Sequence, residues 1–130
     1  MRKIALALAA SAALLTGPAL EAKPRLSPEQ RLDKLLEGRV AGAPQSCLND
    51  FATRDMQVLD GTALVYGRGK TIWVNVPRNA DSLDDDDVLV IRKFGGQLCR
   101  LDMVTTHDRT SGFYTGFVAL GDFVPYRKAS

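Results

Sequence analysis

The chain of 130 residues carries 17 Lys or Arg and 15 Asp or Glu, which gives a formal net charge of +2 at pH 7. So small a charge excludes the strongly basic footprint of a protein that binds nucleic acid or anionic lipid, and we expect neither partner. With 45% hydrophobic residues the chain can bury a core, and its length suits a single domain.

Residues 1–22 have the order that is typical of a secretory signal peptide. A basic start at Arg2 and Lys3 precedes a run of apolar or small residues that is too short to span a bilayer. We expect cleavage after Ala22, with cleavage after Ala19 or an uncleaved anchoring helix as the alternatives. The expected mature protein is periplasmic or secreted and has no integral membrane segment.

Residues 23–46 predict a leader followed by one amphipathic helix. Ser27 can cap a helix whose first residue is Pro28, and Gln30 can complete a capping box. Apolar residues follow at helical spacing, namely Leu32, Leu35, Leu36 and Val40. Because so short a helix is marginal alone, we expect this apolar stripe to pack against another element.

Residues 47–130 predict an antiparallel β domain, because alternating patterns replace the helical spacing. Expected strands lie at 56–59, 62–66, 70–76, 88–94, 97–104 and 113–120. Gly95-Gly96 predicts a tight hairpin turn, residues 105–112 a polar loop, and Phe123 and Tyr126 should close the core. The expected fold is therefore α+β and β-dominated, with one N-terminal helix, then a meander of five or six strands, and a small barrel as an alternative.

Cys47 and Cys99 are the two cysteines of the chain. An isolated pair usually forms a disulfide in an oxidising compartment, and neither residue belongs to a Cys-x-x-Cys motif for redox catalysis or zinc. We therefore expect a disulfide, with two free thiols or half of a metal site as the alternatives. Alternation along the strand expected at 97–104 places Cys99 on the core face with Leu101 and Met103.

Three segments resemble a group of small exported proteins of alphaproteobacteria that have no assigned function: GTALVYGRGKTIWVNVPR, VLVIRKFGGQLCRLDMV and GFYTGFVALGDFVPYR. The resemblance covers most of the chain from Cys47 to Lys128. It implies export, a single domain and a frame with two cysteines. No catalytic residue is assigned in the group, so no site residue follows from it.

The segment NADSLDDDDVLVI (79–91) crowds aspartates directly before an apolar run. Calcium takes about six to eight oxygen ligands, and several could come from the carboxylates of Asp81, Asp84, Asp86 and Asp87. The spacing is not that of an EF-hand, because no glycine stands at its turn and no glutamate closes it. The alternative is a solvated loop whose charges keep the next strand from edge pairing. Calcium is the one cofactor for which the sequence offers ligands.

His107, the only histidine, stands beside Asp108 and close to Ser111, which raises the hypothesis of a small hydrolase. Neighbours within one loop seldom reach the geometry of a catalytic triad, and the chain has no Gly-x-Ser-x-Gly motif. An exposed loop histidine is the simpler interpretation. We therefore do not expect an enzyme.

Trp73 lies on the opposite side of its expected strand from Ile72 and Val74. Either the helix covers Trp73, which the apolar stripe of the helix favours, or Trp73 forms an open contact surface with Tyr66 and Arg68. The leading hypothesis is a non-enzymatic exported envelope protein that binds a protein or glycan through a sheet face, without a cofactor. A calcium-stabilised module and a hydrolase using His107 are the alternatives.

Overall fold

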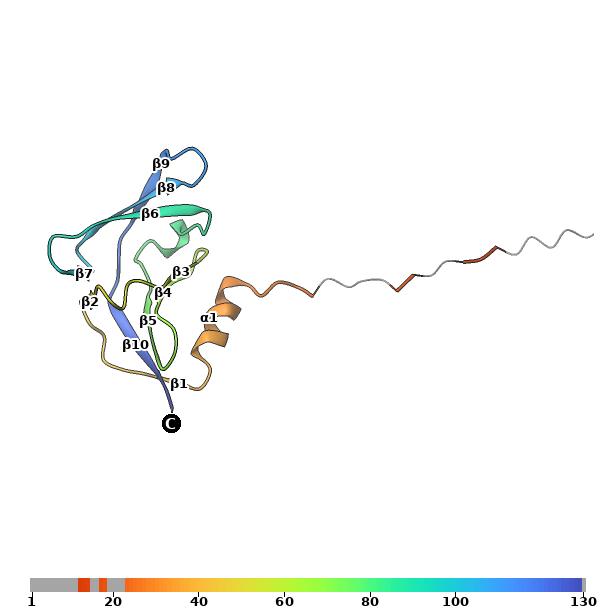
Figure 1. Cartoon of the computed structure of the whole chain (residues 1–130), viewed down its shortest axis with the longest axis horizontal. Coiled ribbons are helices and arrows are strands. Elements are labelled where there is room, and N and C mark those ends of the chain that lie inside the picture. Colours follow the sequence, from red (N-terminus) through yellow and green to blue (C-terminus); the bar gives the residue numbers. More distant parts are fainter. Residues whose placement is uncertain (1–11, 15–16, 19–22, 130) are drawn as a thin grey trace, which may run out of the picture.

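The computed structural model describes residues 12–14, 17–18 and 23–129, so most of the expected signal peptide lies outside the described residues. Within them the chain forms the helix α1 (Pro28–Leu36), the 3₁₀ turn η1 (Ala80–Ser82) and ten strands (Figure 1). The strands are β1 (Arg39–Ala41), β2 (Cys47–Asn49), β3 (Met56–Leu59), β4 (Ala63–Tyr66), β5 (Thr71–Asn75), β6 (Asp87–Arg92), β7 (Gln97–Cys99), β8 (Met103–Asp108), β9 (Tyr114–Val118) and β10 (Phe123–Lys128). No described helix has the length and apolarity needed to cross a membrane.

The strands form three antiparallel sheets of five, two and three strands, in the orders β1-β10-β5-β4-β3, β2-β7 and β6-β8-β9. Figure 1 shows the three-stranded sheet at one end of the molecule and α1 beside the five-stranded sheet. The expectation of a β-dominated α+β fold is confirmed. The expected single meander of five or six strands is wrong, because ten strands form three separate sheets and β1, β2 and β10 were not predicted. The alternative of a small barrel is wrong as well, because none of the three sheets closes on itself.

The helix begins as the sequence predicts. Gln30 donates its backbone N–H to Ser27 Oγ at 3.1 Å, and Ser27 returns its own to Gln30 Oε1 at 2.9 Å. Its end was predicted too late: α1 stops at Leu36, and Val40 lies in β1 with 63% of its surface exposed. Gly38 adopts a positive φ of 68° between the two elements, which allows the chain to reverse there.

The apolar stripe of α1 packs against one face of the five-stranded sheet. Leu32, Leu35 and Leu36 contact a cluster made by Leu59, Ala63, Val65, Ile72 and Val74. The helix therefore covers the Ile72 face of β5 and leaves the Trp73 face to other elements, which corrects the favoured expectation. Arg39 fastens the end of the helix, because its guanidinium donates to Leu35 O at 2.9 Å and to Gly69 O at 2.8 Å.

The opposite face of the five-stranded sheet carries the larger core. Leu64, Tyr66 and Phe123 pack there against residues of the smaller sheets and their loops, namely Leu48, Leu83, Leu98, Val104, Val118 and Leu120. The rings of Tyr66 and Phe123 meet edge to face at 5.8 Å between centroids. Phe123 closes this core as expected, and does so from a strand with β1 and β5 as its neighbours.

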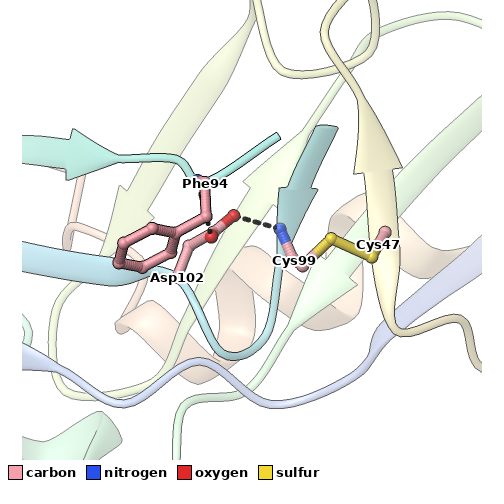
Figure 2. The surroundings of a disulfide bond; sticks show 4 residues. All are labelled: Cys47, Phe94, Cys99 and Asp102. Atoms are coloured by element: carbon pink, nitrogen blue, oxygen red, sulfur yellow. Dashed lines mark hydrogen bonds between the residues drawn. A yellow bond between two sulfur atoms is a disulfide. The ribbon is translucent and has the colours of Figure 1, made fainter. Parts of the chain in front are cut away.

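The segment after β6 departs from the expected hairpin. β6 pairs with β8, whereas β7 pairs with β2, so Gly95-Gly96 does not join two paired strands. Cys47 and Cys99 are direct register partners in the β2–β7 pair, with their Cα atoms 4.0 Å apart, and the expected disulfide between them is confirmed (Figure 2).

Buried Asp102 shapes the turn between β7 and β8. Its carboxylate accepts the backbone N–H of Cys99 at 2.7 Å and that of Phe94 at 3.3 Å (Figure 2). This turn interrupts the strand expected at 97–104 and resets its alternation. Leu101 and Met103, expected in the core with Cys99, are therefore 81% and 52% exposed.

Two asparagines bind the segment that leads from β9 into β10. Asn75 is fully buried, donates its side-chain amide to Gly121 O at 2.7 Å and accepts the Gly121 N–H at 2.9 Å. A Cβ on Gly121 would lie 2.5 Å from Val76 O, so the backbone approach requires glycine. Asn79 makes the same pair of bonds to Phe117 O and Ala119 N, both at 2.8 Å.

Replacing the buried Asn75 by leucine, which has a similar volume, should lower the free energy of unfolding by about 2–4 kcal/mol, because two partly buried backbone groups of Gly121 lose their partner. Urea unfolding of the oxidised protein measures the change. The matched control is Asn79→Leu, whose loss should be smaller because water can reach the groups that Asn79 binds. An Asn75→Leu protein as stable as the wild type would contradict this role.

Replacing both Cys47 and Cys99 by serine should lower the free energy of unfolding by about 4 kcal/mol, because the bond closes a loop with a sequence separation of 52. The urea midpoint of the double variant should match that of the reduced wild-type protein. A double variant with the midpoint of the oxidised protein would show that the bond does not stabilise the fold.

Candidate functional site

The three-stranded sheet carries an exposed apolar surface, which we call the outward face. Register places its residues in three rows: Val88, His107 and Tyr114; Val90, Thr105 and Phe117; and Arg92 and Met103. Its five large apolar side chains are between 41% and 63% exposed. The alternate residues of the same strands point inward, and Val104, Thr106 and Val118 among them are buried. One face of this sheet therefore joins the core while the other presents apolar side chains to solvent.

We did not predict this sheet, because the polar residues Thr105-Thr106-His107-Asp108 indicated a loop. In the structure β8 runs through all four residues. Thr106 tolerates burial because its hydroxyl is hydrogen-bonded to the Thr115 hydroxyl across the strands, with 2.8 Å between the two Oγ1 atoms. An irregularity in register between Thr106 and His107 then brings His107 opposite Tyr114. The hydrogen bond to Thr115 that allows Thr106 to point inward cannot be predicted from the residues next to Thr106.

His107 is part of the outward face and is not in an exposed loop. Its ring meets the ring of Tyr114 edge to face at 5.9 Å. Its Nε2 lies 3.0 Å from Thr105 Oγ1, and its Nδ1 lies 3.3 Å from Gly112 O. Both ring nitrogens thus have partners within the β8–β9 hairpin.

Asp108 and Ser111 serve the turn of that hairpin. The Ser111 hydroxyl donates to Asp108 at 2.9 Å, and Asp108 also accepts the backbone N–H groups of Ser111 and Thr110. These bonds from Ser111 and Thr110 lower the pKa of the Asp108 carboxyl. Ser111 therefore bonds to the acid and not to His107, and the three residues do not form the relay that the hydrolase hypothesis requires.

A hollow of about 440 Å³ extends the outward face at its Met103 end. Its lining includes Met103, Tyr114 and Phe117 from the face, together with Arg78 and Arg100. Arg100 pairs with Asp122 at 3.0 Å. Among the described residues, Arg78 and Arg92 take part in no ion pair. This end of the apolar surface is therefore bordered by positive charge.

The contact surface expected from Tyr66, Arg68 and Trp73 is only partly assembled. Tyr66 is 1% exposed, and its burial raises the pKa of its hydroxyl, so it belongs to the core and not to a surface. Trp73 is half-buried and lines a second hollow together with Arg68. This second hollow lies on the face of the five-stranded sheet that α1 does not cover.

The acidic loop does not bring the four expected calcium ligands together. Asp81 lies in η1, Asp86 is exposed, and Asp87 in β6 accepts a hydrogen bond from the Thr115 hydroxyl at 2.8 Å. Asp84 instead gathers with two aspartates that were not expected as ligands, Asp60 and Asp85, with carboxylate oxygens within 4.8 Å of one another. Asp60 comes from the turn between β3 and β4, which no local pattern connects to this loop.

The Asp60 carboxylate raises the pKa of the exposed Asp85 carboxyl by charge repulsion. A folded-state pKa above that of the unfolded chain means that the ionised group lowers stability above the unfolded pKa, whereas below it the effect is absent. We therefore expect Asp85→Asn to raise the thermal midpoint slightly at pH 7 in EDTA, with no gain in acid.

Differential scanning fluorimetry measures the effect of charge repulsion in EDTA and any effect of calcium at millimolar concentration. Asp81→Asn is the control outside the cluster. A lower midpoint of Asp85→Asn in EDTA would contradict the repulsion. A calcium-dependent rise of the wild-type midpoint that Asp85→Asn abolishes would establish the calcium-stabilised alternative.

Comparison of the chain with protein-family models, with curated proteins and with solved structures found no match. The resemblance to exported proteins of alphaproteobacteria therefore stays a prediction. The function therefore has to be inferred from the surfaces of the molecule. Among these, the outward face gathers exposed apolar side chains on three adjacent strands.

Proposed function

We propose that this is an exported, non-enzymatic envelope protein that binds a partner protein through the outward face. The observation that carries the proposal is the row-by-row exposure of Val88, Val90, Met103, Tyr114 and Phe117 on three adjacent strands. Single exposed apolar residues are ordinary, whereas apolar side chains gathered on one face mark interaction sites.

The residue types and charges of the face indicate the chemistry of the partner. Tyr, Phe and Met are enriched at the centres of protein interfaces, and arginine is the cation most common there. Arg78 and Arg92 border the Met103 end without an ion pair among the described residues. The proposed partner therefore presents apolar side chains flanked by carboxylates.

The polar groups of the outward face favour a protein over a glycan. Thr105 and His107 stand in its centre and are bonded to each other at 3.0 Å. A glycan needs free donors and acceptors for its hydroxyl groups, and this pair offers few. A flat apolar sheet face is better matched by apolar side chains than by a sugar.

Export is supported by the disulfide and by the signal-like order of residues 1–22. Disulfides persist in the periplasm and outside the cell and are rare in the cytosol. A periplasmic or secreted location would place the outward face among envelope proteins. The location is part of the proposal, and its direct test is the N-terminal sequence of the protein recovered from the periplasm.

A photo-crosslinking amino acid at Phe117 should form an adduct with one envelope protein in the producing cell. The matched control is the same amino acid at Val40, which is 63% exposed on a different sheet and should give no such adduct. Mass spectrometry of the adduct identifies the partner. Adding Tyr114→Thr and Met103→Thr should remove the adduct, because these side chains supply much of the buried apolar surface.

The thermal midpoints of these variants must match that of the parent protein, so that loss of binding is distinguished from loss of folding. An adduct only with a second copy of the chain would replace the proposed partner by self-association. Equal adducts at Phe117 and Val40, or none at either position, would contradict binding through the outward face.

A further inference from the structure

The second hollow, beside Trp73, has a chemistry that differs from that of the outward face. It has a volume of about 550 Å³ and lies between the turn that follows β2 and the turn that joins β4 to β5. Its lining includes two aromatic residues and four charged ones: Phe51, Trp73, Arg54, Asp55, Arg68 and Arg127. A volume of this size is typical of sites for small ligands.

The walls of this hollow are held by hydrogen bonds within the protein. The Gly67 N–H donates to Asp55 O at 2.8 Å and so joins one turn to the other. The Asn49 side chain accepts the Ala52 N–H at 2.9 Å, and the Thr53 hydroxyl donates to Asp50 O at 2.8 Å. Because β2 is also tied to β7 by the disulfide, the hollow exists before any ligand arrives, which lowers the entropic cost of binding.

The charges of the hollow favour an anion. The lining contains three guanidinium groups and one carboxylate. The carboxylate of Asp55 lies 3.6 Å from the guanidinium of Arg68, and both side chains are largely exposed. The Arg54 guanidinium stacks over the Phe51 ring at 5.3 Å. Among the described residues, Arg54 and Arg127 form no ion pair. Guanidinium groups without a partner recognise carboxylates and phosphates through paired hydrogen bonds.

The strands and aromatic residues that line the hollow favour a sugar over a peptide as the ligand. β5 and β10, which supply Thr71, Trp73 and Arg127 to the lining, are inner strands of the five-stranded sheet, so this wall offers no free strand edge to a peptide backbone. On this wall recognition comes from side chains. The aromatic surfaces of Trp73 and Phe51 suit the apolar face of a sugar ring, and Asp55 can accept hydrogen bonds from its hydroxyl groups.

We propose that this hollow binds one or two rings of an acidic oligosaccharide whose rings carry carboxylates. Trp73 stacks on the ring, Arg127 and Arg54 bind the carboxylate, and Asp55 accepts from a hydroxyl group. The site is separate from the outward face, because the two surfaces lie on different sheets. Either one can be lost by mutation without the other.

The intrinsic fluorescence of the oxidised protein tests the proposal directly, because Trp73 is the single tryptophan of the chain. The probe is α-1,4-linked trigalacturonate. Maltotriose is the neutral trisaccharide with the same linkage, and triglutamate and inorganic phosphate are the anions without a sugar. We expect a saturable change in Trp73 emission with trigalacturonate that the other three compounds do not reproduce at the same concentration.

Arg127→Gln should weaken trigalacturonate binding by about tenfold, because it removes one charged hydrogen-bonding partner of the carboxylate. The matched control is Arg92→Gln, an exposed arginine of the outward face, which should bind as the wild type does. Raised salt should weaken binding to the wild type more than to Arg127→Gln. Thermal midpoints confirm that both variants are folded.

Failure to saturate with trigalacturonate would overturn the proposal, and so would equal binding of maltotriose. Equal binding of phosphate would reduce the hollow to a general anion site, and equal binding of triglutamate would show that the ring is not recognised. An Arg127→Gln protein that binds as tightly as the Arg92→Gln control would also overturn the assigned contact.

Discussion

The buried amide of Asn75 is the contact on which the arrangement of the sheets depends. It satisfies both backbone groups of Gly121 at the point where the chain leaves the three-stranded sheet and enters the five-stranded one. Without it, two partly buried backbone groups would lose their hydrogen-bonding partner. Asn79 makes the same pair of bonds to Phe117 O and Ala119 N at the end of β9, so the crossing segment is held from residue 117 to residue 121.

This constraint also determines which surfaces remain free. The backbone of Phe117 is fixed by Asn79, and its side chain is thereby directed to the outward face. β10, which begins two residues after Gly121, brings Phe123 into the core and Arg127 to the rim of the hollow beside Trp73. The two candidate binding surfaces are therefore positioned by one crossing of the chain, although they lie on separate sheets.

The sequence predicts well those features that depend on neighbouring residues or that have a single possible partner. The capping box involves Ser27 and Gln30 alone, and a pair of cysteines has a single way to bond within the chain. What it predicts poorly depends on a distant partner. The polar residues of β8 form a strand because Thr115 satisfies Thr106, and Asp60 meets Asp85 only after β3 and β4 have folded. The outward face was missed for the same reason, since its central strand has the composition of a loop.

The pairing of β1 with β10 bears on when the chain can fold. Arg39 lies opposite Lys128, so β1 and β10 cannot join the five-stranded sheet until residues 123–128 have been synthesised. Contacts so distant in sequence are slow to form, because a long loop must close before they add stability. β5 therefore keeps one edge without a hydrogen-bonding partner until β10 is present.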